Sequence, residues 1–345
     1  MRLCHDSCVA SNNIRKAHFP KFLGIGAARS ATTWLSDNLS AHPDVWIPRI
    51  KELHYFTRAP KYFGPSHLNN TSLARKLLSS EQSCRRYRQK LYRAVGSNLL
   101  RPSVKKLRWD ANYLLRRPSD RWYASLFTQG HARVTGEITP RYSALELDDI
   151  VRLRELMPDV KLIYIMRDPV DRAWSLVRYH TKKYNQPLTA LPFQELHKRV
   201  FHPAVVQQSD YEAILERWRQ IFPPQQLLIL YYDDVVKNPD ALLKRISGFL
   251  EIDATPLGNA PDDRAAATDA ARVVNASNSA RIPLQLEQTL IDFYRPMVSR
   301  LSESEGSYFR TWLHGYELRS RGAQDSDRVT PLLQLDTLQL GNRIA

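Results

Sequence analysis

Four short runs of apolar, β-branched and aromatic residues lie far apart along the chain. They read KFLGIG from Lys21, RVTGE from Arg133, VKLIYIM from Val160 and LLILYY from Leu227. Apolar runs of this length are typical of strands that are buried on both faces of a sheet. The pattern therefore predicts four buried strands.

Segments with apolar residues at helical spacing lie between these strands. ATTWLSDNLSAH ends before Pro43, and SALELDDIVRLRELM ends before Pro158. NPDALLKRISGFLEI begins with Asn238 as a cap, followed by a proline at the first helical position. Strands that alternate with helices predict an α/β fold, in which helices cover both faces of a parallel sheet.

Residues from about 62 to 121 have a different character. They include RKLLSSEQSCRRYRQKLYRAV, a basic helical pattern, which predicts a mostly helical insertion in the same domain. Two interpretations stay open: a solvated helical layer with a packed inner face, or a basic, aromatic wall on which the sugar rings of an acceptor stack. The second interpretation rests on aromatic residues that we expect to be exposed: Tyr87, Tyr92, Trp109, Tyr113, Trp122 and Tyr123.

The domain boundaries follow from the same pattern. We expect an N-terminal extension over residues 1–19, one domain over 20–315 and a C-terminal tail over 316–345. No run of about eighteen apolar residues predicts a membrane span, and the N-terminus lacks the apolar stretch of a secretory signal. Three cysteines give no even disulfide framework, so we expect free thiols and a cytoplasmic location.

The charge of the chain narrows the choice of partners. Fifty Lys and Arg residues against thirty-five Asp and Glu residues give a net charge of +15. Such a field favours an anionic partner, such as a nucleotide or a polyanion, although it also fits a basic surface that serves only solubility. No motif that reads nucleic acid accompanies the charge, so we expect no nucleic-acid partner.

The first candidate site is the loop from Gly26 to Thr33, where a strand runs into a helix. Unpaired amides and the positive end of the helix dipole favour an anion there. Arg29 can contact phosphate oxygens, and hydroxyls are offered by Ser30, Thr32 and Thr33. The alternative is an ordinary turn with a threonine cap and an arginine in solvent. The loop lacks the lysine and the second glycine of the nucleotide triphosphatase motif.

The second candidate site follows the third predicted strand, in RDPVDRAWS. Arg167 leaves the strand, Asp168 can cap the next helix, and Ser175 lies two turns along that helix. Arg167 and Ser175 could hold one phosphate together. The alternative is a surface salt bridge from Arg167 to a neighbouring aspartate, which would contribute little.

The third candidate site is the segment KELHYF. Glu52 and His54 are two residues apart, so in an extended segment both would point the same way. Either could act as the general base toward a hydroxyl group. A single Glu or His in such a segment is more often structural.

Taken together, these pieces resemble one family. PKFLGIGAARSATTWL, KELHYF, GEITPRYS, RDPVDRAWS and VVNASNSARIP follow the order and rough spacing seen in sulfotransferases, in particular the bacterial and heparan-sulfate-type branch. The resemblance extends from about residue 20 to residue 312 and is weakest across the insertion. It implies a P-loop-like three-layer fold.

The resemblance also implies a donor and a set of roles. The donor would be 3′-phosphoadenosine-5′-phosphosulfate, with no metal, and the acceptor a hydroxyl group, expected on a saccharide. Glu52 would be the base. The 5′-phosphosulfate would lie at Gly26–Thr33, including Ala31, and the 3′-phosphate at Arg167 and Ser175. Arg281 matches a basic loop that closes over the donor.

Three positions depart from the family pattern. Arg29 replaces the usual lysine, which suits charge stabilisation but makes a poor proton donor. Ala31 replaces a glycine, and Ile138 replaces a lysine that heparan-type members carry, which bears on acceptor recognition. Two other functions stay open: an ATP-dependent small-molecule kinase, and a catalytically silent protein that binds nucleotides or polyanions.

Overall fold

The computed structural model describes residues 18–63, 68, 72–100, 103–128, 132–253 and 281–321. The chain divides into two compact units. The first comprises residues 1–166 and 213–275, and the second comprises residues 167–212 and 276–345. Cys4, Cys8 and the segment VVNASNSA lie outside the described residues, whereas Cys84 is a buried free thiol.

A five-stranded parallel sheet forms the centre of the first unit. Its strands are β1 (Phe22–Gly26), β2 (Val45–Trp46), β3 (Val134–Ile138), β4 (Lys161–Met166) and β5 (Leu227–Tyr231), in the order β2-β3-β1-β4-β5. The four predicted strands and the parallel sheet are confirmed. β2 was not predicted, because two residues are too few to give a pattern.

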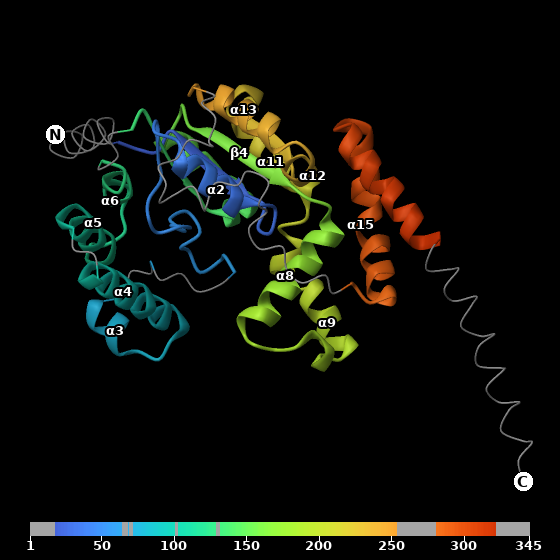
Figure 1. Ribbon diagram of the computed structural model, residues 1–345, viewed down its shortest axis with the longest axis horizontal. Coiled ribbons are helices and arrows are strands. Elements are labelled where there is room, and N and C mark those ends of the chain that lie inside the picture. The colour runs from blue at the N-terminus through green and yellow to red at the C-terminus, as the bar shows by residue number, and fades with distance from the viewer. Residues whose placement is uncertain are drawn as a thin grey trace, which may run out of the picture. The chain divides into compact units, whose positions relative to one another are not determined.

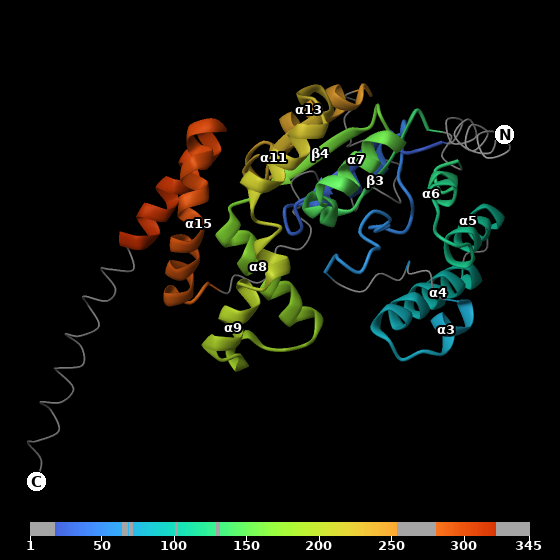
Figure 2. The same cartoon turned by 180° about the vertical axis from the view of Figure 1, so that it is seen from behind.

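Helices cover both faces of this sheet. α2 (Thr32–Ala41) and α13 (Pro239–Leu250) lie on one face, and α7 (Leu147–Leu156) lies on the other, as a comparison of Figures 1 and 2 shows. The core under α2 and α13 joins Trp34 and Leu35 to Ile163, Ile165 and neighbouring strand residues. The α/β prediction is therefore confirmed. α13 begins at Pro239 as expected, but the Asn238 side chain makes no capping bond.

Close packing between β1 and β3 explains one departure from the family pattern. A Cβ atom at Gly24 would lie only 2.7 Å from the Ile138 side chain, and one at Gly136 would lie 2.1 Å from the Phe22 ring. Ile138 is 1% exposed and belongs to the apolar core. This side chain therefore packs against β1, which a lysine could not do without burying its charge.

The insertion is helical, as predicted. It contains α3 (Leu73–Leu78), α4 (Gln82–Leu100), α5 (Val104–Leu115) and α6 (Asp120–Ser125). Of its six aromatic residues expected to be exposed, only Tyr92 is, and the other five are buried. Trp109 stacks on Tyr113, which stacks on Trp122. The prediction of an aromatic wall is wrong for these five side chains, because each ring packs against the next inside the helical layer.

The described part of the second unit is almost entirely helical. It contains α8 (Pro169–Lys183), α9 (Phe193–Val200), α10 (Pro203–Val206), α15 (Leu284–Ser304) and a helix over residues 307–321. Arg172 is fully buried in it, where Nε donates to Ser209 Oγ at 2.9 Å. Across the described parts of both units, every helix is too short or too polar to cross a membrane.

Candidate active site

The loop that joins β1 to α2 has the backbone of an anion cradle. Arg29 and Ala31 both have left-handed conformations, with φ of 71° and 58°. Ala31 is the N-cap residue of α2, and no side chain bonds the first-turn amides at this cap. The predicted alternative, a threonine cap, is therefore wrong. No side chain of the described residues caps this end of the helix, and the positive end of the helix dipole favours an anion there.

Ser30 adds a second feature to this loop. Its side chain is fully buried, and its hydroxyl has no hydrogen-bond partner among the described residues. Buried hydroxyls are normally paired, so an unsatisfied one in such a loop fits a ligand oxygen as its partner. Gly26 has a φ of 157°, and a Cβ there would lie 2.9 Å from the Pro140 carbonyl oxygen. The loop thus requires glycine at this point.

Lys51 also contacts the loop, a role that the sequence analysis did not predict. Its Nζ donates to Thr33 Oγ1 at 2.6 Å. Burial lowers the pKa of Lys51, and the positive charge of Arg29 lowers it further, although Glu52 and Asp37 oppose the shift. Two cations, Arg29 and Lys51, therefore act on the same loop. The only signal in the sequence was the position of Lys51 directly before Glu52.

Glu52 and His54 face each other, but not in the way that was predicted. His54 Nε2 lies 3.4 Å from Glu52 Oε2. The backbone is left-handed at both residues, with φ of 60° and 59°, so the expected extended segment is wrong. Such conformations are strained for residues with side chains, and they tend to occur at functional sites.

The environment sets the protonation of this pair. Burial lowers the pKa of His54, so the imidazole is neutral at pH 7 and acts on Glu52 through a hydrogen bond. Burial alone would raise the pKa of Glu52, but the His54 contact together with Lys51 and Arg141 holds that pKa below its ordinary value. Glu52 is therefore an ionised carboxylate at neutral pH.

A buried carboxylate holds this strained segment in place. Glu137, at the end of β3, accepts from the Leu53 amide at 3.3 Å, from Thr139 Oγ1 at 2.8 Å and from the hydroxyl of Tyr142 at 3.0 Å. Tyr142 in turn accepts from the Tyr55 amide at 2.9 Å. The chain is thus fixed on both sides of His54. Sequence reasoning missed Glu137, because its role depends on contacts between distant segments.

The insertion contributes cations to the surroundings of Glu52. Lys90 of α4 interacts electrostatically with Glu52, and burial lowers the pKa of Lys90 to about 8. Burial also lowers the pKa of Arg141. The charge of Arg86 on α4 lowers this pKa further, whereas the charge of Glu52 raises it. Glu52 is therefore a carboxylate among basic side chains.

In the second unit, Asp168 caps α8 as predicted. Its carboxylate accepts from the amide of Val170 at 2.8 Å and from that of Asp171 at 3.3 Å. The hydroxyl of Tyr316 donates to the same carboxylate at 3.2 Å, and Arg319 lies 3.4 Å from it. Arg319 forms ion pairs with both Asp168 and Asp171.

Arg167 and Arg281 line one cavity of about 400 Å³ in this unit. Trp174, Arg178 and Arg319 also line it, together with two carboxylates, Asp171 and Glu287. Ser175 is 2% exposed and is not among the lining residues, so the pairing expected for Arg167 and Ser175 is not seen in this cavity. The structure therefore brings two of the predicted donor residues together, and adds three that the sequence did not indicate.

Comparison with known proteins gives a consistent result. The model of the sulfotransferase family matches residues 20–256. Carbohydrate sulfotransferase 15 from Homo sapiens is 26% identical over 329 residues, which cover 87% of this chain and 55% of that protein. Heparan sulfate glucosamine 3-O-sulfotransferase 3A1 from Mus musculus is 30% identical over 141 residues, covering 37% of this chain and 34% of that protein. The chain spans about half the length, or less, of these curated relatives.

Solved structures share the fold. A sulfotransferase from Alicyclobacillus acidocaldarius aligns with a TM-score of 0.56 at 20% identity, over 85% of this chain and 98% of that chain. The sulfotransferase domain from the curacin biosynthetic pathway aligns with a TM-score of 0.50, also at 20% identity, over 83% and 99%. The family model covers well over half of the chain, from β1 to beyond α13. The protein belongs to the sulfotransferase family.

Proposed function

We propose that this protein transfers a sulfuryl group from 3′-phosphoadenosine-5′-phosphosulfate to a hydroxyl group of a saccharide. The observation that carries the proposal is the convergence, in one unit, of an uncapped helix N-terminus, two loop cations and the Glu52–His54 pair. Relatives named as carbohydrate and heparan sulfate sulfotransferases support a saccharide as acceptor.

The chemistry is an in-line displacement at sulfur. The acceptor oxygen attacks the sulfur atom, and the bond from sulfur to the bridging oxygen of the 5′-phosphate breaks. The electron pair of that bond stays on the leaving phosphate, and the acceptor proton passes to the Glu52 carboxylate. The products are a sulfate ester and 3′,5′-adenosine bisphosphate.

The residues of the loop suit the charge that develops on the leaving phosphate. The amides at the start of α2, the Ser30 hydroxyl and the side chains of Arg29 and Lys51 stabilise that charge. Arg29 holds its proton throughout, so it acts as a fixed charge. Lys51 is the better proton donor to the leaving oxygen, because burial lowers its pKa.

His54 has a supporting role in this scheme. As a neutral imidazole, it donates to Glu52 and keeps the carboxylate oriented toward the acceptor. Because burial lowers its pKa, His54 is not protonated at neutral pH. The pKa of Glu52 is lowered, so its carboxylate is a weak base. Its position beside the loop, and not its basicity, gives it the advantage over a base in solution.

The test is a screen of saccharide acceptors with donor labelled at sulfur. Label recovered in an acceptor whose mass has increased by one sulfuryl group supports the proposal. Glu52→Gln serves as the matched control, since it changes one atom of the carboxylate. Transfer of phosphate from ATP with Mg²⁺, and no transfer of sulfur, would instead support the kinase. Binding of donor without any turnover would support the silent binding protein.

A further inference from the structure

We propose that a basic cavity beside the segment 46–49 binds an anionic stretch of the acceptor, carrying uronate carboxylates or sulfate groups. The cavity has a volume of about 1000 Å³ and lies within the first unit, between residues 46–49, α5 and residues 125–128. The inference rests on the proposed saccharide acceptor and specifies its charge. It concerns a site separate from the residues placed in catalysis.

The charge of the cavity is the first argument. Five cations line it, and none of its described lining residues is a carboxylate; the five are Arg49, Lys105, Lys106, Arg108 and Arg116. Lys105, Arg108 and Arg116 are exposed. Asp110, a carboxylate of α5, is buried and is paired with Arg49. Like charges concentrated in a concave site repel one another, and an anion relieves that repulsion.

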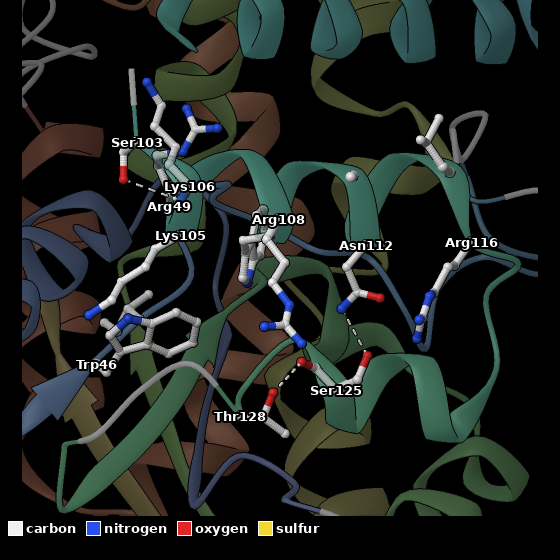
Figure 3. Close-up of a pocket in the computed structure, with 14 residues that line it drawn as sticks. Trp46, Arg49, Ser103, Lys105, Lys106, Arg108, Asn112, Arg116, Ser125 and Thr128 are labelled. Atoms are coloured by element: carbon white, nitrogen blue, oxygen red, sulfur yellow. Dashed lines mark hydrogen bonds between the residues drawn. The ribbon is translucent and has the colours of Figure 1, made fainter. Parts of the chain in front are cut away.

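The arrangement on α5 is the second argument. Lys105, Arg108, Asn112 and Arg116 extend from the same side of the helix, as Figure 3 shows. Lys105, Arg108 and Asn112 are three and four residues apart and so share a face of α5, and Arg116 is the C-cap residue that follows the last turn. A row of cations along one helix matches an elongated anion with repeated charges better than it matches a compact one.

The non-ionic lining is the third argument, and it favours a saccharide over nucleic acid. Hydroxyl groups of Ser103, Ser125 and Thr128 and the amide of Asn112 line the cavity. Trp46 is half-buried, and its ring packs edge-on against Phe127, which presents one fixed indole. Trp109 is buried. Single-stranded nucleic acid is bound by several exposed aromatic side chains in succession, which this cavity does not offer.

Chain continuity is the fourth argument. Arg49 precedes Glu52 by three residues, so their Cα atoms lie within about 11 Å of each other. An elongated acceptor in the cavity therefore reaches the region of the general base. The basic side chains around Glu52, Lys90 and Arg141, extend the same charge preference to that region.

The test compares two triple variants with equal loss of charge. Lys105→Gln, Arg108→Gln and Arg116→Gln together remove three cations of the cavity and keep most of each side-chain stem. Arg121→Gln, Lys244→Gln and Arg245→Gln remove three exposed cations of the same unit that do not line the cavity. The probes are a uronate-bearing hexasaccharide, its carboxyl-reduced neutral counterpart and a single-stranded DNA oligonucleotide. Affinity is measured by calorimetry at fixed salt concentration, without donor.

We expect the cavity variant to bind the hexasaccharide on the order of 10- to 100-fold more weakly, the sum of three charged contacts. The control variant should change affinity less than about threefold, since screened surface charges contribute little. Equal losses in both variants, or equal affinity of the wild type for the neutral counterpart, would overturn the proposal. Tighter binding of the oligonucleotide than of the hexasaccharide, lost in the cavity variant, would replace it with a nucleic-acid site.

Two further measurements separate this proposal from the proposed function. Unchanged melting temperatures of both variants show that they fold, and unchanged binding of 3′,5′-adenosine bisphosphate shows that the donor site is intact. If the wild type binds the hexasaccharide through the cavity but transfers no sulfur, the function fails and the cavity stands. If sulfur transfer and acceptor KM are unaffected in the cavity variant, the cavity fails and the function stands.

Discussion

Two helices of this protein follow a parallel strand after a short loop, α2 after the five residues 27–31 and α8 after the two residues 167–168, and their N-termini differ. Within the part of the chain that the structure describes, no side chain caps the start of α2, and the buried hydroxyl of Ser30 beside it has no hydrogen-bond partner. The start of α8 is closed by Asp168, which is itself held by Tyr316 and Arg319. Both loops contain an arginine, Arg29 and Arg167, but a side chain caps only the second of these two helix N-termini.

The difference indicates how each site would hold a phosphate. At α2, backbone amides and the helix dipole would contribute, so the site suits the group on which charge develops. At α8, the amides are satisfied, so an anion in the cavity at Arg167 would depend on arginine side chains alone. We therefore expect the first site to act in catalysis and the second in ground-state binding of the proposed donor.

The largest expected effect is a loss of turnover on substitution of the proposed general base, Glu52, which lies beside the first of these two sites. Glu52→Gln should lower turnover by about a hundredfold or more while leaving binding of 3′,5′-adenosine bisphosphate unchanged, because only proton acceptance is lost. His54→Ala should cost less, through loss of the contact that orients Glu52. Turnover and bisphosphate affinity of both variants from pH 5 to pH 9 provide the measurement. Near-normal turnover of Glu52→Gln beside an inactive His54→Ala would show that the histidine is the base.

The next effect concerns the second site. Arg167→Ala should weaken binding of the bisphosphate by about 1.5–3 kcal/mol, the scale of a charged hydrogen bond. The loss should vanish for adenosine 5′-monophosphate, which lacks the 3′-phosphate. Calorimetric titration of wild type and variant with both nucleotides checks this. Equal discrimination between the two nucleotides by both proteins would remove Arg167 from the 3′-phosphate site.

A smaller effect, with a distinctive pH dependence, is expected at Lys51. Burial lowers the pKa of Lys51, so its ammonium loses its proton as the pH rises through a value below that of free lysine. Turnover that depends on this charge should therefore fall on the basic side. Lys51→Arg should keep the charge and extend activity to higher pH, at a cost of about tenfold at pH 7 if proton donation is lost. The measurement is kcat of the wild type and of Lys51→Arg from pH 7 to pH 10. An identical decrease of kcat at high pH in both proteins would rule out a role for the Lys51 charge.

The smallest effect is expected from Tyr142→Phe. This change removes one donor to Glu137 and the acceptor of the Tyr55 amide, both buried. Stability should drop by about 1–3 kcal/mol, the cost of unsatisfied buried groups. If the hydrogen bonds of Glu137 and Tyr142 position Glu52, kcat should fall severalfold while the affinity for the bisphosphate stays unchanged. Denaturant unfolding and steady-state kinetics measure the two effects. A loss of stability with an unchanged kcat would show that these hydrogen bonds serve stability alone.

The sequence predicted features that depend on local pattern. Four strands, the helix that ends before Pro43 and the cap at Asp168 are set by residues within a few positions, and the structure confirms them. Features that depend on distant contacts were not accessible. Glu137 looks like an ordinary strand residue until Tyr123, Thr139, Tyr142 and Leu53 converge on it.

Backbone geometry and burial account for the remaining errors. Left-handed conformations such as those at Glu52 and His54 are uncommon for residues other than glycine, so the pattern KELHYF predicted an extended segment. Trp109 and Tyr113 were expected to be exposed, yet both lie on the buried side of α5. Lys51 was given no role at the loop, because its contact with Thr33 joins two segments 18 residues apart.

The most direct test of the central claim is the melting temperature with three nucleotides at equal concentration. 3′,5′-Adenosine bisphosphate presents one phosphate group to each of two sites, whereas adenosine 5′-diphosphate places both on one side, and ATP with Mg²⁺ represents the kinase. A ligand at one hundred times its Kd stabilises the native state by about 2.7 kcal/mol. We expect a shift of several degrees with the 3′,5′-bisphosphate and a much smaller shift with the other two nucleotides. An equal or larger shift with ATP and Mg²⁺, and none with the bisphosphate, would contradict it.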